Sequence, residues 1–79
     1  TSATLGADLR ANKTRQDYLR AALNRDPDGT LVATPFDTQD SSVLSLFAHA
    51  GALVIRPPHA VAARAGETVE IIPLREPNA

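Results

Sequence analysis

The tetrapeptide Asp26-Pro27-Asp28-Gly29 decides how the first half of this 79-residue chain folds. Proline at its second position and glycine at its fourth fit a type I turn whose glycine accepts a positive φ. The residues that follow, Leu-Val-Ala-Thr at 31–34, form a short run with high β propensity. The turn therefore predicts a β-hairpin, and it favours a strand for the residues that precede it.

The segment before this turn, residues 14–23, carries signals for both a helix and a strand. Thr14 and Asp17 have the spacing of a capping box, and the alanine, leucine and arginine content favours a helix. A strand would instead place alternate side chains on opposite faces. One face would carry Tyr18, Arg20 and Ala22, and the other Leu19, Ala21 and Leu23. Local propensity thus favours a helix, whereas the adjoining turn favours a strand.

Three further strands are expected along the chain. Residues 3–10 alternate between apolar and polar side chains, which is typical of a half-buried strand. Residues 52–55 form a compact apolar run suited to a strand buried on both sides, and two consecutive prolines end it. After a turn at Gly66-Glu67, residues 68–74 alternate again and predict a final strand.

Residues 38–51 predict one short helix. Their apolar side chains recur at i, i+3, i+4 and i+7, the spacing of one helical stripe. These side chains are Val43, Leu46, Phe47 and Ala50. Ser41 or Ser42 can cap the N-terminus, and Gly51 can adopt the left-handed conformation that ends a helix. We therefore expect a helix of about two turns over residues 42–50.

The start of this helix is a candidate anion-binding site. Free backbone N–H groups and the positive end of the helix dipole converge there, and Gln39, Ser41 and Ser42 add side-chain donors. Arg15 and Arg20 carry guanidinium groups that suit a phosphate or a tetrahedral oxyanion. Because five residues separate them, the two arginines cannot share a face and should have separate roles. Simple capping and surface ion pairs are the alternative interpretations.

Composition and length argue against several functional classes. A chain of 79 residues forms one domain and leaves little room for an enclosed active site, so a complete enzyme is not expected. Eight basic and nine acidic residues argue against a surface for nucleic acid or acidic lipids. The chain has no cysteine, no apolar run long enough to span a membrane and no ligand pair beside His49 or His59. No metal site is therefore predicted.

Several short motifs follow one another in a fixed order along the chain. They are Arg15-Gln16-Asp17-Tyr18-Leu19-Arg20, Asp28-Gly29, Pro35, Gln39-Asp40-Ser41-Ser42, Ala50-Gly51-Ala52-Leu53-Val54-Ile55 with Pro57, and Ala65-Gly66-Glu67-Thr68-Val69-Glu70. This ordered set, from about Leu5 to Leu74, resembles the C-terminal domain of the MoeA/gephyrin family of molybdopterin molybdenumtransferases. The family pattern has two arginines around an aromatic residue, then Gln-Gly-Ser, then Ala-Asn-Gly before an apolar strand.

Three positions depart from that family pattern. Thr14 stands where the family has glycine, and Gly51 stands where it has asparagine. Asp40 replaces the central glycine of Gln-Gly-Ser, whose flanks are matched by Gln39 and Ser41. A carboxylate at this place would weaken phosphate or molybdate binding unless it points away or caps the helix. Asp40 is thus the departure with the largest consequence for the anion site.

The resemblance implies an all-β fold. Its expected form is a bent-ribbon, β-clip-like incomplete barrel of about five to six short strands with the one short α-helix at about 42–50. Residues 15–23 are then a strand, because sheet context often overrides local propensity. Residues 1–79 would form a single domain, the C-terminal β domain of a longer multidomain enzyme. We expect its tail, residues 75–79, to be frayed.

The resemblance also implies a function. The full-length enzyme would be cytoplasmic and homodimeric, and would insert molybdate into adenylylated molybdopterin, releasing AMP with Mg²⁺ bound by its other domains. This domain would line the substrate cleft without catalytic residues, cofactor or activity of its own. Arg20 and Ser41 would contact the substrate or molybdate, with Arg15, Gln39 and Ser42 supporting them. The alternative is a non-catalytic structural or protein-interaction β domain.

Overall fold

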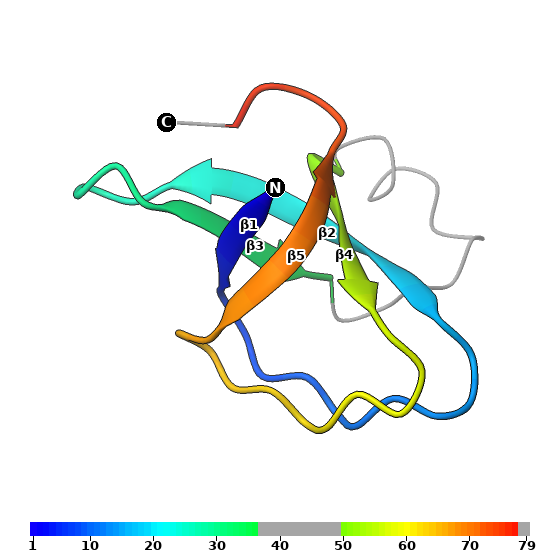
Figure 1. Ribbon diagram of the computed structural model, residues 1–79. Coiled ribbons are helices and arrows are strands. Elements are labelled where there is room, and N and C mark those ends of the chain that lie inside the picture. The colour runs from blue at the N-terminus through cyan, green and yellow to red at the C-terminus, as the bar shows by residue number, and fades with distance from the viewer. Residues whose placement is uncertain (37–49, 78–79) are drawn as a thin grey trace.

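Five β-strands form the fold in the computed structural model, which describes residues 1–36 and 50–77 (Figure 1). They are β1 (Ser2–Leu5), β2 (Asp17–Arg25), β3 (Leu31–Pro35), β4 (Ala52–Arg56) and β5 (Thr68–Pro73). The predicted all-β class and the number of short strands are confirmed. The helix expected at 42–50 lies, except for Ala50, outside the described residues.

The predicted turn joins β2 to β3. The amide of Gly29 donates a hydrogen bond to the carbonyl of Asp26 at 2.9 Å, and Gly29 has a φ of 82°. The Asp26 carboxylate accepts from the amides of Asp28 and Thr30, at 3.0 and 2.9 Å. A type I turn followed by a left-handed glycine is a standard hairpin connection. The turn therefore overrides the helix propensity of the preceding segment, which is strand β2.

Strand β2 is shared between two antiparallel neighbours. Its first residues pair with β4 and its last residues with β3, and Ala21 pairs with both Pro35 and Ala52. The expected alternation holds, because Ala21 and Leu23 are buried whereas Tyr18 is exposed. The remaining pairings close the sheet in the order β1-β3-β2-β4-β5, with β1 parallel to β3 and antiparallel to β5 (Figure 1). Every strand thus has two neighbours.

The barrel core consists largely of small side chains. It comprises Ala3, Leu5, Ala21, Leu23, Ala33, Ala52, Val54, Ala63, Val69 and Ile71. A barrel of five strands has a narrow interior, so alanine at inward positions allows the strands to approach. The expectation that residues 52–55 are buried on both sides is wrong in part. Ala52 and Val54 are fully buried, but Leu53 and Ile55 are half-buried, because only one face of each strand meets the core.

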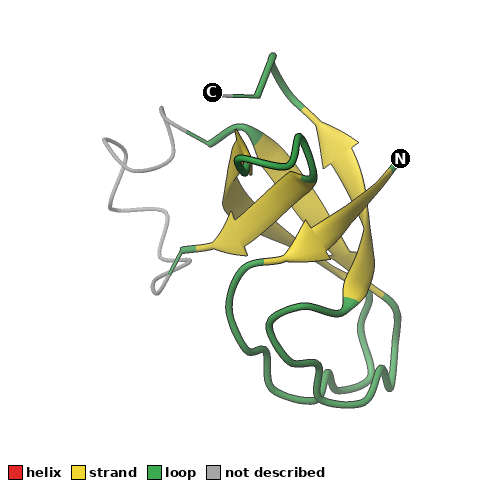
Figure 2. Cartoon of the chain, turned by 90° about the vertical axis from the view of Figure 1, so that its left-hand side faces the viewer, coloured by secondary structure: helices red, strands yellow, loops and turns green. Residues whose placement is uncertain are grey.

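Beyond β1 the chain continues as an irregular ribbon. Residues 6–13 run beside residues 59–67, as the two loops below the barrel in Figure 2 show. Leu9 and Ala63 exchange two backbone hydrogen bonds, and the amide of Asn12 donates to the carbonyl of Ala60 at 2.8 Å. The predicted strand 3–10 is therefore regular only as far as Leu5, although its pairing continues. This pair of segments is called the ribbon below.

Arg56 fastens the ribbon to the barrel. Its side chain is only 6% exposed, and its Nη2 donates to the carbonyls of Arg10 and Val61, each at 2.8 Å. Asn12 adds a second link, because its Nδ2 donates to the carbonyls of Arg15, Arg56 and Pro57 at 2.7, 3.0 and 2.9 Å. Arg56 thus binds one carbonyl of each ribbon segment, and Asn12, within the ribbon, binds carbonyls before β2 and at the end of β4.

Gly51 has a different role from the predicted one. Its φ is outside the left-handed range, so it does not close a helix in the expected way. A Cβ at this position would lie 2.8 Å from the Cβ of Leu23, which is closer than real contacts allow. Gly51 also donates its amide to the carbonyl of Ala21 at 2.9 Å. Glycine is required here because the chain passes directly over β2.

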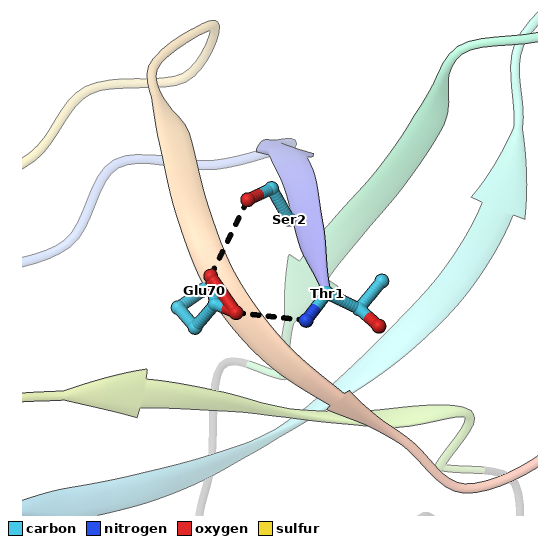
Figure 3. Close-up of polar contacts among 3 residues, drawn as sticks. All are labelled: Thr1, Ser2 and Glu70. Carbon is cyan, nitrogen blue, oxygen red and sulfur yellow. Dashed lines mark hydrogen bonds and ion pairs between the residues drawn. The ribbon is translucent and has the colours of Figure 1, made fainter.

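The seam between β1 and β5 carries a solvent-exposed polar cluster (Figure 3). The α-amino group of Thr1 lies 2.7 Å from Oε1 of Glu70, and the hydroxyl of Ser2 donates to Oε2 at 3.3 Å. In the 79-residue chain, the hydrogen bond from the α-amino group and its positive charge hold the pKa of Glu70 below its ordinary value. This contact is accessible to water, so its contribution to stability is small.

Replacing Arg56 by methionine should detach the ribbon from the barrel. The change removes two charged hydrogen bonds and leaves two carbonyls without their donor, so we expect a loss of roughly 2–4 kcal/mol in the free energy of unfolding. Urea denaturation measures it, and hydrogen exchange at Leu9 and Ala63 should accelerate. Arg64→Met, at an exposed ribbon position, is the control. Equal stability of the Arg56→Met and Arg64→Met variants would contradict the role of Arg56.

The Glu70 contact predicts a pH dependence. Because folding lowers the pKa of Glu70, its stabilising contribution is present above the pKa of the unfolded chain and is lost as the pH falls through the folded pKa. Thermal melts of the 79-residue chain from about pH 6 to about pH 2 should show this loss. Glu70→Gln should reduce the slope of stability against pH, and Glu76→Gln should not. An unchanged slope in Glu70→Gln would rule the contact out.

Candidate functional site

The five side chains of the predicted anion site are only partly described. Gln39, Ser41 and Ser42 lie outside the described residues, which end at Phe36 before this segment and resume at Ala50 after it. Arg15 and Arg20 are both described, and they occupy different parts of the molecule.

Arg20 lies in the middle of β2. It pairs with Leu53 of β4, and its side chain is half-buried on the outer face of the sheet, the face that also carries Tyr18. The backbone of Arg20 is thus held by pairing with β4 on one side and by the amide of Phe36 on the other. A guanidinium group on a rigid strand is held in place at a lower entropic cost than one on a loop.

The segment that carries Gln39, Ser41 and Ser42 begins and ends beside Arg20. The amide of Phe36, the last described residue before the segment, donates to the carbonyl of Arg20 at 3.1 Å. The amide of Gly51, just after the segment, donates to the carbonyl of Ala21 at 2.9 Å. Both described ends are thus attached to neighbouring residues of β2.

Arg15 is in the loop that precedes β2. It is exposed, and its carbonyl accepts a hydrogen bond from Nδ2 of Asn12 at 2.7 Å. With Lys13, Thr14 and Asp17, Arg15 lines a depression of about 370 Å³ at the end of the ribbon. Arg20 is not among the described residues that line this depression. Arg15 and Arg20 therefore face different surroundings.

A second hollow, the mouth pocket, opens between the end of the barrel and the ribbon. Its volume is about 350 Å³, and its described lining residues are Ala7, Asp8, Leu9, Arg10, Ala11, Asn12, Asp17, Leu19, Pro35, Phe36 and Arg56. The mouths of β-barrels are common places for ligand sites. Sequence analysis missed this pocket, because its lining comes from four separate stretches of the chain, between Ala7 and Arg56.

Arg56 is the buried charge of the mouth pocket. Within the described residues its Nη2 makes both hydrogen bonds to the protein, and no buried side-chain nitrogen or oxygen lacks a partner. One signal in the sequence could have predicted the burial of Arg56: it is two residues after Val54 and four after Ala52, so in a strand all three lie on the same, buried face. The two prolines that follow marked it instead as the end of a strand.

The described residues do not fit a metal site. Among residues 1–36 and 50–77, no three histidine, aspartate or glutamate side chains come together in a way that could hold a metal ion. The same residues contain no helix long and apolar enough to cross a membrane.

Comparison with protein families identifies the family of the chain. A family model described as the MoeA C-terminal region (domain IV) matches residues 2–74, which include all five strands and the ribbon. A search among curated proteins finds no match. The family match covers nearly the whole chain and confirms the resemblance drawn from the ordered motifs. The chain belongs to the MoeA family as its C-terminal region, domain IV, and is thus a domain of the enzymes of molybdenum cofactor biosynthesis.

Proposed function

We propose that this chain is the C-terminal domain of an enzyme that inserts molybdate into adenylylated molybdopterin and releases AMP. The match to the MoeA C-terminal region supports this reaction class. In the proposal the domain lines the substrate cleft of a cytoplasmic homodimer and has no activity alone. In this proposal Mg²⁺ is bound by the other domains of the full-length enzyme.

The observation that carries the proposal is the attachment of the serine-containing segment beside Arg20. Phe36, just before residues 37–49, and Gly51, just after Ala50, bind the backbone of β2 at Arg20 and Ala21. On this ground the proposal assigns Arg20 to the same anionic group as Ser41. Donors held in place in this way stabilise negative charge without having to reorganise during the reaction. A guanidinium group is well suited to phosphate and to molybdate oxygens.

The remaining predicted residues have supporting roles in this proposal. Gln39 and Ser42 add donors next to Ser41, and Arg15 contributes positive charge from the depression that it shares with Lys13. Because Arg15 and Arg20 have different surroundings, they would bind different parts of the substrate. None of these groups moves protons, so the domain would contribute binding and charge stabilisation rather than acid–base chemistry.

A protein-interaction role is the second candidate, and the outer face of the sheet favours it. Tyr18, Ile72 and Leu74 are 48, 40 and 50% exposed. Cross-strand pairs of Tyr18 with Ile55 and of Leu53 with Ile72 make this apolar surface continuous over β2, β4 and β5. Continuous apolar surface is typical of a contact with another domain or subunit. Such a contact is compatible with the transferase function.

Charge reversal at Arg20 tests the transferase function. In the full-length enzyme, Arg20→Glu should reduce cofactor formation by at least about 100-fold, because it replaces a donor to the anionic substrate with a repelling carboxylate. Formation is measured by reactivation of a cofactor-free molybdenum enzyme. Arg64→Glu, at an exposed ribbon position, makes the same change in charge and should leave activity unchanged.

The folded state of the variant must be measured with its activity. Circular dichroism and the thermal midpoint of the Arg20→Glu domain should stay close to those of the parent. If they do not, the neutral variant Arg20→Gln replaces it, and it should still lose activity by at least about tenfold. Full activity of a folded Arg20 variant would refute the assignment of Arg20 to the substrate.

A further inference from the structure

The ribbon lies outside the barrel and buries few apolar side chains (Figure 2). Among its described residues, 6–13 and 59–67, Ala63 alone is buried, and Leu9 is only partly buried against the core. The other nine residues of the core cluster all belong to the strands. Because burial of apolar surface is the main stabilising contribution to folding, the ribbon is held more weakly than the barrel.

Backbone hydrogen bonds join the two ribbon segments to each other. Leu9 and Ala63 exchange two of them, at 2.8 and 3.0 Å, and the amide of His59 donates to the carbonyl of Lys13 at 2.7 Å. Each of these bonds requires both segments to lie in the same register. We therefore expect the bonds of the ribbon to form and break together.

Arg56 connects both ribbon segments to the barrel. Its Nη2 donates to the carbonyl of Arg10 in the first segment and to the carbonyl of Val61 in the second, each at 2.8 Å. One nitrogen atom on the inner face of β4 thus serves both segments. Loss of its contacts releases the two segments at the same time and leaves both carbonyls to water.

The mouth pocket depends on the position of the ribbon. Six of its eleven described lining residues, 7–12, belong to the ribbon, and the other five belong to the end of the barrel. Without the ribbon, the hollow of about 350 Å³ loses one wall and becomes an open surface. A ligand that needs both walls would bind only the closed ribbon, and would therefore stabilise it.

From these contacts we infer that the ribbon opens and closes as one unit on a barrel that stays folded, and that this motion makes and removes the mouth pocket. Arg56 is the latch of the closed state. Opening breaks its two hydrogen bonds together with those between the ribbon segments. The inference is independent of the proposed function, because it names no substrate and does not involve Arg20.

Thiol labelling measures this opening, because the chain has no cysteine of its own. Ala63→Cys places a buried thiol in the ribbon, and Val54→Cys places one in the barrel core. Each single-cysteine chain is treated with iodoacetamide under native conditions. Ala63→Cys should react at least about tenfold faster than Val54→Cys, because its thiol is exposed when the ribbon opens, whereas that of Val54→Cys requires unfolding of the barrel.

Two background substitutions separate ribbon opening from global unfolding. Ile71→Val, in the barrel core, should accelerate labelling of Val54→Cys about threefold to tenfold and leave that of Ala63→Cys unchanged. Arg56→Lys should accelerate both by the same factor, about tenfold, because the ribbon is open in both reactive states. If Arg56→Lys does not fold, Asn12→Ala, which removes the second link of the ribbon, takes its place.

Leu19→Cys tests the link between the ribbon and the pocket, because Leu19 is in the barrel wall of the mouth pocket. A maleimide attached to polyethylene glycol is too bulky to enter the closed pocket. Its reaction with Leu19→Cys should therefore accelerate in the Arg56→Lys background, or in Asn12→Ala where that replaces it. The Ile71→Val background should leave the reaction unchanged.

Three results would overturn the inference. The first is equal labelling rates of Ala63→Cys and Val54→Cys in the parent chain. The second is acceleration of both by the same factor in Ile71→Val, because the ribbon then opens only when the whole chain unfolds. The third is a rate for Leu19→Cys that loosening the ribbon leaves unchanged, because the pocket then does not depend on the ribbon.

Discussion

The close approach of three strands at Ala21 is the constraint on which the rest of the structure depends. Ala21 pairs with Pro35 on one side and with Ala52 on the other, and Ala21, Ala33 and Ala52 have no exposed surface. A larger side chain at any of these positions would force the neighbouring strands apart, because the interior of the barrel is already filled. The same need for a small residue applies at Gly51, because a Cβ there would collide with Leu23.

This constraint also arranges the two candidate sites. Because β3 and β4 meet β2 at the same residue, the connection between them starts and finishes next to Arg20, on the outer face of the barrel. Residues that alternate with Arg20 along β2 lie on the inner face of the sheet, and two of them, Asp17 and Leu19, line the mouth pocket. The two faces of one strand thus lead to different places, the outer face at Arg20 and the inner face at the mouth pocket with Asp17.

Local rules were sufficient for part of this structure. The turn at Asp26-Gly29 and the alternation in β1, β2 and β5 could be predicted, because each depends on residues close in sequence. Arg56 and Gly51 were misinterpreted because their roles come from segments distant in sequence: Arg56 binds carbonyls of the ribbon, and Gly51 packs on β2. The assignment of Arg20 to an anion site stays a prediction, and no local rule could bring together Asp17, Phe36 and Arg56 at the mouth pocket.

The closure of the barrel by β1 has a consequence for folding during synthesis. The β2–β3 hairpin connects residues close in the chain, whereas β1 pairs with β5 through Ser2 and Glu70, near opposite ends of the chain. Non-local pairing carries a large loop-closure cost and forms slowly. A ribosome-bound chain therefore holds Ala3 without its partner Val69 until β5 has left the exit tunnel. Closure of the barrel is thus tied to the emergence of β5.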